Sequence, residues 1–274
     1  MLKSHARIGG LFSVDLRRML TQRLFYIMLG VSAVLPVLIL VMTTAFGGTD
    51  ASGGTNASVG TYATGGTDAF GGTYATGGAI FTSVWQAIGS TGSGMSMDLT
   101  SMCNINLIYF LAAVFACLFT ADDFRSGYCK NIFAIREKKA DYVFSKIMVC
   151  FIAGVLMLLA YFAGTLLGGR IAGLSFAMEG FAAWNLVMCM ISKIFVMAIF
   201  VAIFVLMGVI AKRRAWMSIL LSFTVGMFMY MVIPMMTPLN AGLLNVIMCL
   251  AGGIIFTAAI GSAGRMVLDR TDIL

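Results

Sequence analysis

The chain has 274 residues, 60% of them hydrophobic and 11% charged, with a formal net charge of +7. Soluble domains average about 25% charged residues, so this composition excludes an ordinary soluble domain and favours a protein that lies in lipid. The basic residues are spread between apolar runs without a nucleic-acid-binding motif, so we exclude nucleic acid as a partner and expect membrane lipid instead.

Positive charge is confined to a few places along the chain. Of the 18 basic residues, all but Arg170 and Lys193 lie in four short segments, 3–23, 125–146, 212–214 and 265–270. These segments stand beside or between apolar runs. That arrangement is typical of a multi-pass membrane protein whose basic segments face the cytoplasm.

Several apolar runs are long enough to cross a bilayer, which takes about 20 residues of α-helix. They predict six transmembrane helices, at 24–46, 102–121, 147–168, 186–211, 215–236 and 241–264. The fold class that we predict is therefore an all-α integral membrane protein, with residues 1–274 forming a single transmembrane domain. An even number of spans with the basic segments inside places the N and C termini in the cytoplasm.

Residues 5–20 predict an amphipathic helix that lies in the membrane interface before the first span. Its apolar residues share one face at helical spacing, and its basic residues, including Arg17 and Arg18, are expected to face away from it. A disordered basic tail is the alternative, because Gly9 and Gly10 weaken the helix.

The first external loop, 47–78, consists of Gly/Thr/Ala hexapeptide repeats. This sequence offers little apolar area for folding, so a flexible loop is one interpretation, and a small repeat structure that caps an outer exit is the other. Residues 79–88 follow with a pattern that predicts a short amphipathic helix at the outer membrane surface.

The spans themselves carry little chemistry. No G-x-x-x-x-G-K-[ST] phosphate loop occurs in the sequence, so we predict neither an enzyme nor a cofactor bound by this chain. With one histidine, His5, there is no His/Cys cluster for a metal. Lys193 is the charged residue inside a predicted span. Its stem either snorkels to the outer surface or faces a cavity, where it is a candidate cargo contact.

The predicted cytoplasmic segment 122–146 is rich in charge. It holds ten charged residues among 25, interleaved with aromatic and aliphatic residues, which predicts a docking surface on a water-facing loop. We interpret Asp122 and Asp123, beside Arg125, as a solvated salt-bridge cluster. Gly127 permits the turn out of the second span, and residues 129–135 predict a short helix across the membrane surface.

The order of residues in this segment resembles the first cytoplasmic loop of permease subunits from type-2 ABC exporters. The match comprises, in order, Asp123, Phe124, Arg125, Gly127, Lys130, the cluster of Arg136, Lys138 and Lys139, and Lys146. The resemblance implies that the short helix is a coupling helix and that a separate ATPase subunit, which binds ATP and Mg, docks on it. It also implies that two copies of the chain pair. The ATPase-coupling residues that it implies are Asp122, Asp123, Arg125, Gly127, Tyr128, Lys130, Ile132, Phe133, Arg136 and Lys146.

Within that family the chain resembles lantibiotic-immunity permeases and phenol-soluble modulin exporter permeases. This implies a bacterial plasma membrane and an amphipathic or antimicrobial peptide as cargo, exported for toxin secretion or self-protection. The alternatives are an ABC exporter of lipids or drugs, an ion-coupled secondary transporter and a membrane-embedded enzyme. A secondary transporter is expected to show inverted repeats, and an enzyme a buried catalytic cluster. The sequence shows neither pattern.

Overall fold

The computed structural model describes residues 2–46, 81, 83–89, 104–135, 139–178, 180–212, 214–230 and 232–270. Long apolar segments become helices because a helix satisfies every backbone polar group within its own segment. The described helices are α1 (Leu2–Thr21), α2 (Arg23–Phe46), the 3₁₀ helix η1 (Val84–Ala87), α4 (Leu107–Arg125), α5 (Tyr128–Ile135), α6 (Lys139–Ile171), α7 (Ala183–Ala211), α8 (Ala215–Tyr230), α9 (Ile233–Met236) and α10 (Leu243–Arg270). The described residues form helices and no strand of a sheet, which confirms the predicted all-α fold class for this part of the chain.

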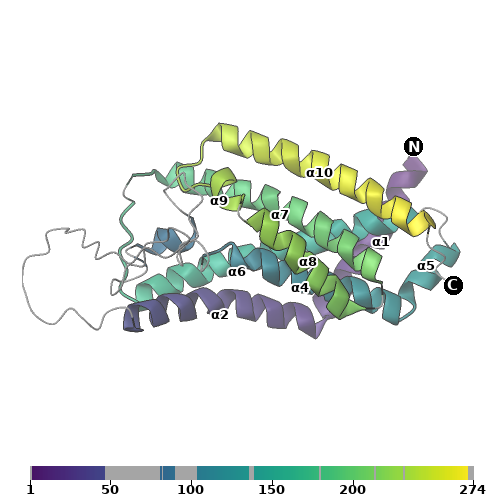
Figure 1. Ribbon diagram of the computed structural model, residues 1–274, viewed down its shortest axis with the longest axis horizontal. Coiled ribbons are helices and arrows are strands. Elements are labelled where there is room, and N and C mark those ends of the chain that lie inside the picture. The colour runs from purple at the N-terminus through teal and green to yellow at the C-terminus, as the bar shows by residue number, and fades with distance from the viewer. Residues whose placement is uncertain are drawn as a thin grey trace, which may run out of the picture.

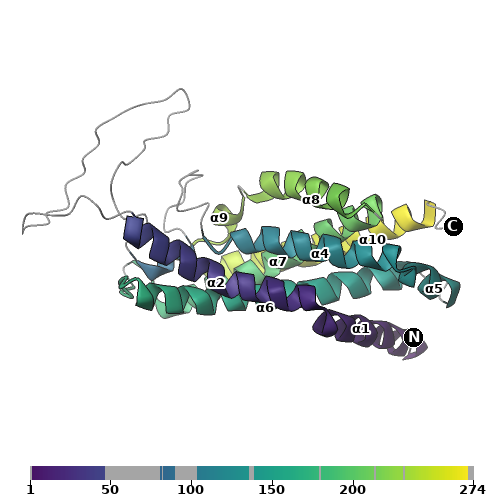
Figure 2. The ribbon, with the colours of Figure 1, turned by 90° about the horizontal axis from the view of Figure 1, so that it is seen from below.

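The long helices form one elongated bundle (Figure 1). α2 packs along α6, and α10 packs along α7. α4 contacts α6, α7 and α8, and in Figure 2 it lies beside α7 in the middle of the bundle. α6 and α7 are therefore the two helices on which the others pack.

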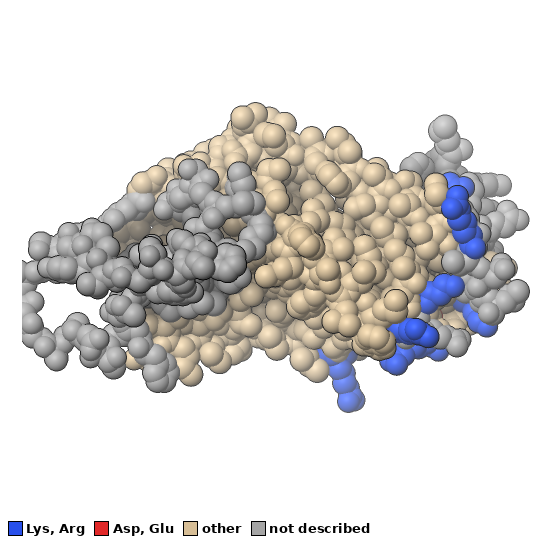
Figure 3. All heavy atoms as spheres, in the orientation of Figure 1, with Lys and Arg blue, Asp and Glu red and all other residues tan. Residues whose placement is uncertain are grey.

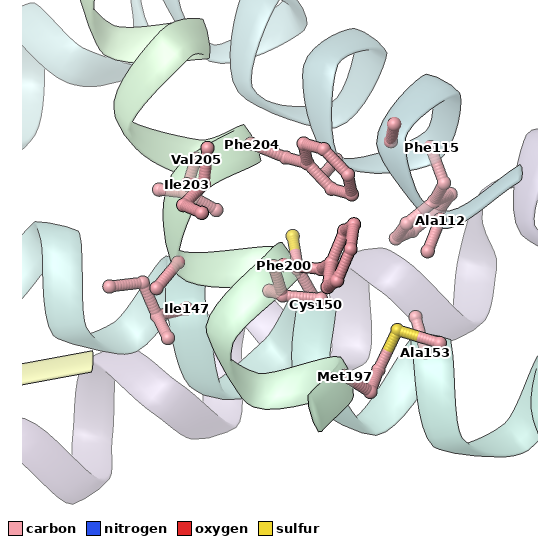
Figure 4. Close-up of a cluster of buried hydrophobic side chains, with 14 of the residues drawn as sticks. Ala112, Phe115, Ile147, Cys150, Ala153, Met197, Phe200, Ile203, Phe204 and Val205 are labelled. Atoms are coloured by element: carbon pink, nitrogen blue, oxygen red, sulfur yellow. The ribbon is translucent and has the colours of Figure 1, made fainter. Parts of the chain in front are cut away.

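The core lies where α7 meets α4 and α6. Phe200 and Phe204 of α7 stack edge to face with ring centroids 5.7 Å apart. Around them lie Phe115 of α4 and Ile147 of α6 (Figure 4). Because lipid tails are as apolar as these side chains, van der Waals packing holds this core together more than exclusion of water does.

Among the described residues, five helices are long and apolar enough to cross a membrane: α2, α4, α6, α7 and α10. The sixth predicted span, 215–236, is divided between α8, of 16 residues, and the four-residue α9. Pro234 lies in the first turn of α9, where its missing N–H costs no hydrogen bond. The count of six spans stays a prediction.

The two ends of the bundle differ in charge. We call basic end the end that holds α5, the start of α1 and the end of α10 (Figure 1). Figure 3 shows Lys and Arg side chains gathered there, whereas most of the rest of that face is neither basic nor acidic. The exposed basic residues of α1, α4, α5 and α10 include Arg17, Arg125, Lys130 and Arg270.

We call distal end the opposite end, which holds η1 and α9. The prediction of an amphipathic helix on the outer membrane surface at 79–88 is wrong for the described residues. Trp85 and Ile88 are buried inside the protein, and the Trp85 indole N–H donates a hydrogen bond of 3.2 Å to the Phe176 carbonyl. An amphipathic pattern requires an apolar surface, and here protein supplies it instead of lipid. The hexapeptide loop 47–78 lies outside the described residues.

Glycines bring α2 and α6 close together. A Cβ atom on Gly164 would overlap the carbonyl oxygen of Ala33, and one on Gly168 would lie 2.8 Å from the Val37 Cα. Small residues at such a spacing allow the backbones of membrane helices to touch. This G-x-x-x-G motif therefore packs two helices of the same chain.

Substituting Gly164→Ala is expected to lower stability, because the added methyl group forces the two helices apart. Overpacking costs about 1–3 kcal/mol, which corresponds to a drop in Tm of several degrees, roughly 2–4 °C per kcal/mol. The matched control is Gly30→Ala on α2, where nothing lies within 4 Å of the added atom. Thermal unfolding in detergent measures both, and equal Tm values for the two variants would contradict the close packing.

Candidate functional site

Four charged side chains converge at the basic end, within the bundle. Asp15 and Arg18 come from α1, Asp123 from α4 and Lys146 from α6. The side chains of Asp15, Asp123 and Lys146 are 0% exposed, and that of Arg18 is 26% exposed. We call these four residues the buried charge cluster. It joins three helices that are far apart in the sequence.

Asp123 is held by both basic residues of the cluster. One carboxylate oxygen, Oδ1, lies 2.8 Å from Arg18 Nη1, and the other, Oδ2, lies 2.6 Å from Lys146 Nζ. The Tyr142 hydroxyl donates a further hydrogen bond of 2.9 Å to Oδ2. Both oxygens of this buried carboxylate are therefore paired.

Asp15 is satisfied in the same way. Its Oδ1 lies 2.9 Å from Lys146 Nζ and accepts a hydrogen bond of 3.2 Å from the Tyr128 hydroxyl. Its Oδ2 accepts a hydrogen bond of 2.7 Å from Ser145. Lys146 thus bridges the two carboxylates, one from α1 and one from α4.

Aromatic rings cover the two cations. The Arg18 guanidinium carbon lies 4.0 Å from the centre of the Tyr128 ring, and Lys146 Nζ lies 4.1 Å from the centre of the Phe119 ring. Such contacts strengthen when water is excluded. Burial and the neighbouring Asp15 carboxylate raise the pKa of Tyr128 to about 12, so its hydroxyl stays protonated and remains a donor.

The cluster is formally neutral, with two carboxylates, one ammonium and one guanidinium. Burial disfavours charge on Arg18, but the paired Asp123 outweighs it, and the pKa of Arg18 rises above its ordinary value. A buried ion pair is tolerable when geometry is good and its remaining polar atoms are hydrogen-bonded. Both carboxylates meet these conditions. The cluster links α1, α4 and α6 through these ion pairs, and the Tyr128 hydroxyl adds α5 to them.

The cluster also sets the position of α5. Gly127 has φ of +75°, a left-handed conformation that turns the chain sharply between α4 and α5. Tyr128 then reaches back to Asp15, and the Phe133 ring lies 5.4 Å from that of Tyr142 in an edge-to-face contact. Ile132 packs against the core as well. The side chain of Lys130 remains exposed on the opposite face.

The structure corrects two sequence-based interpretations. Asp122 is 52% exposed, as expected of a solvated group, but Asp123 is fully buried. Arg18, expected to face away from the apolar side of its helix, instead points into the bundle toward Asp123. The physical reason is that Asp123 and Lys146 form a polar site inside the protein. An interpretation that places both carboxylates in water does not anticipate this site.

The predicted coupling residues therefore divide into groups. Asp123, Tyr128 and Lys146 belong to or touch the cluster, and Ile132 and Phe133 pack inward. Arg125 and Lys130 are exposed at the surface. Arg136 lies outside the described residues.

Sequence reasoning missed Asp15, Tyr142 and Ser145 as members or partners of the cluster. One signal was present for Asp15. It lies four residues after Leu11 and four before Met19, two buried apolar residues, so the helical repeat places it on the buried face. An acid in the middle of an apolar face needs a buried partner.

Lys193 lies near the distal end and is 0% exposed. It does not snorkel to the surface. Its Nζ donates hydrogen bonds of 2.9 Å to Asn106 Oδ1 and 3.0 Å to Thr237 Oγ1. Within the described part of the chain, no group of three or more His, Cys, Asp or Glu side chains could hold a metal ion.

The fold and the cluster together define a multi-pass helical membrane protein whose basic end carries a short helix fixed by buried charge. A family model described as ABC-2 family transporter protein matches residues 69–229, more than half of the chain. The chain belongs to this family. It is thus a membrane permease of an ABC transporter, a transport subunit that works with a separate ATP-binding ATPase. Comparison with curated proteins and with solved structures gave no significant match.

Replacing Lys146 by Met is expected to destabilise the protein strongly. The change leaves Asp15 and Asp123 buried with one cation between them, and removing one partner of a buried ion pair costs about 3–5 kcal/mol. Thermal unfolding in detergent is expected to show a Tm lower by roughly 10 °C.

The double variant Lys146→Met with Asp15→Asn restores a neutral cluster and is expected to recover part of that loss. Arg125→Gln, a change at an exposed site, serves as the control and is expected to shift stability by less than about 0.5 kcal/mol. If the double variant is no more stable than Lys146→Met alone, charge balance is not what the cluster provides.

Burial raises the pKa of the Cys129 thiol on α5 to about 12, and its side chain is 1% exposed. Because the thiolate is the reactive form, its reaction with N-ethylmaleimide at pH 8 is expected to be roughly a thousandfold slower than that of an ordinary exposed cysteine. The control is Lys130→Cys, the exposed neighbour on the same helix. Peptide mass spectrometry over time measures both rates, and similar rates would show that α5 does not pack as described.

Proposed function

We propose that this chain is the permease subunit of an ATP-driven exporter of amphipathic peptides and that α5 is its coupling helix. Two copies pair around the pathway, and each copy docks one ATPase subunit at the basic end, which faces the cytoplasm of a bacterial cell. The orientation follows from the basic segments, which remain on the cytoplasmic side of a membrane. α8 with α9 then supplies the sixth crossing, and both termini are cytoplasmic.

The observation that carries this proposal is the attachment of α5 to the buried charge cluster. A helix that only connected two spans could lie loosely on the membrane surface. In α5, instead, the Tyr128 hydroxyl donates a hydrogen bond to Asp15, and the Phe133 ring packs edge to face against Tyr142 of α6. A push on α5 is therefore passed to α1, α4 and α6 together, which a coupling helix requires.

The docking face that we propose is the exposed side of α5 and the end of α4. Arg125 and Lys130 are exposed there, and both are basic. Charged residues at the rim of an interface steer association with a partner of opposite charge. We therefore expect an acidic groove on the ATPase. The cluster residues lie behind this face and act by holding the helix in place.

The proposed cargo rests on composition and on the resemblance to peptide exporters. The chain contains 22 Met and 21 Phe. Flexible Met-rich surfaces accept varied apolar partners, which suits amphipathic peptides in toxin secretion or self-protection. Lipids or drugs as cargo, and ion-coupled transport by the chain alone, are the other outcomes of the test.

The test is reconstitution. The chain is co-expressed with a candidate ABC ATPase subunit, purified and placed in vesicles with a fluorescent amphipathic peptide. ATP-dependent peptide movement that needs both subunits is the expected result. Movement by the isolated chain under an ion gradient, or no association with the ATPase, would reject the proposal, and movement of lipid or drug alone would reject the cargo.

Reversing charge on the docking face is expected to weaken ATPase binding without affecting the fold. The double variant Arg125→Glu with Lys130→Glu is expected to lower affinity for the ATPase by about tenfold, with weaker salt dependence. Arg170→Glu, an exposed arginine at the distal end, is the matched control. Pull-down at several salt concentrations measures the effect, and equal affinity for all three chains would remove this face from the docking site.

A further inference from the structure

The distal end contains a polar group that the proposed coupling mechanism does not use. Lys193 is fully buried on α7, and its described hydrogen-bond partners are neutral: the Asn106 side chain, at the start of α4, and Thr237, just after α9. Asn106 and Thr237 are themselves buried. One ammonium therefore ties α7 to two other parts of the bundle.

The surroundings show that this is an organised contact. The Tyr109 hydroxyl donates a hydrogen bond of 3.0 Å to the Lys193 carbonyl, which adds a second tie between α4 and α7. Thr237 donates to the Ile233 carbonyl, and the Cys189 thiol donates to the Thr237 carbonyl at 3.4 Å. Thr237, the residue that follows α9, thus contacts two side chains of α7, Cys189 and Lys193.

The segment around η1 rests on the same two places. The backbone N–H of Ile105, next to Asn106, donates a hydrogen bond of 2.8 Å to the Ala87 carbonyl. Leu239, two residues after Thr237, packs so closely that a Cβ atom on Gly89 would lie 3.2 Å from its Cγ. Trp85 and Ile88 cluster with Leu239 and Leu186 of α7. η1 therefore covers the distal end of the helices that Lys193 joins.

We propose that Lys193, Asn106 and Thr237 form a latch that keeps η1 seated as a cap on the distal end of the pathway subunit. When the latch is closed, the start of α4 and the end of α9 are held at the spacing that η1 requires. When Lys193 loses its hydrogen bond to either partner, Ile105 and Leu239 move, and η1 loses the residues on which it packs. The latch rests on the proposed function. The distal end is the side where cargo leaves only if the basic end faces the cytoplasm.

The latch opens more easily than an ion pair because the hydrogen-bond partners of Lys193 are neutral. A carboxylate beside a buried lysine forms a tight pair that is costly to break, as at the basic end. Amide and hydroxyl oxygens hold the ammonium less firmly, since a charged acceptor makes a stronger hydrogen bond. The same chain therefore has a rigid charged joint at one end and a weaker polar joint at the other.

The test measures access to η1 from outside. Ala87→Cys places a thiol on a residue that is 1% exposed. Cells or vesicles that contain the full chain without its ATPase are treated with a membrane-impermeant maleimide, and chains without the added cysteine give the blank. Hydrogen exchange of the Ile105 amide provides a readout that needs no label.

Lys193→Met is expected to raise the labelling rate of the cysteine at position 87 and the exchange rate of the Ile105 amide by roughly tenfold, because both hydrogen bonds of the ammonium are lost. Asn106→Asp is expected to lower both rates below those of the unaltered chain, because a carboxylate strengthens the latch. The Asn106 side chain makes no capping hydrogen bond to α4, so the change acts on its contact with Lys193. Thr165→Val, which removes a hydrogen bond within α6 alone, is the control and is expected to leave both rates unchanged.

Unchanged rates in both Lys193→Met and Asn106→Asp would overturn the latch, as would equal rises in Lys193→Met and the control. If Lys193→Met does not fold, Asn106→Asp decides by itself, and rates equal to those of the unaltered chain would overturn the proposal. The measurement needs no ATPase and no cargo. Its failure is therefore separate from failure of the reconstitution that tests the proposed function.

Discussion

Lys146 lies between two carboxylates in a place that water does not reach, and the basic end of the protein depends on this interaction. An ammonium in a medium of low dielectric is costly unless it is paired and hydrogen-bonded. Asp15 and Asp123 supply that pairing from two different helices. The position of α1 on the bundle and the direction of α5 follow from it, because Tyr128 and Tyr142 donate to the same two carboxylates.

The two ends of the bundle use polar groups differently. At the basic end, opposite charges are balanced and aromatic rings cover the cations, and the ion pairs tie α1, α4 and α6 together. At the distal end, Lys193 has neutral partners, and Trp85 packs in an apolar cluster with Ile88, Leu186 and Leu239. Under the proposed function the ATPase drives the basic end and the distal end opens, and the two kinds of contact suit those tasks.

Sequence patterns predicted the long helices well, because a continuous apolar run in lipid has one stable backbone solution. They were weaker where a local pattern has two physical interpretations. The run 215–236 is apolar throughout, yet α8 ends before Pro234 and a short helix follows. The amphipathic pattern at 79–88 could not reveal whether the apolar surface that it meets is lipid or protein. The resemblance located Asp123 and Lys146, but their partner Asp15 lies too far away in the chain for any local pattern to connect them.

That separation has a consequence for how the protein is made. Asp15 precedes Lys146 by 131 residues, so the ribosome completes α2 and α4 before the partner of Asp15 exists. During that interval α1 lacks the partner for its acid, which lies on the same helix face as Leu11 and Met19. Final docking of the first helix therefore follows insertion of α6, and assembly of this membrane protein does not run in simple order from the N terminus.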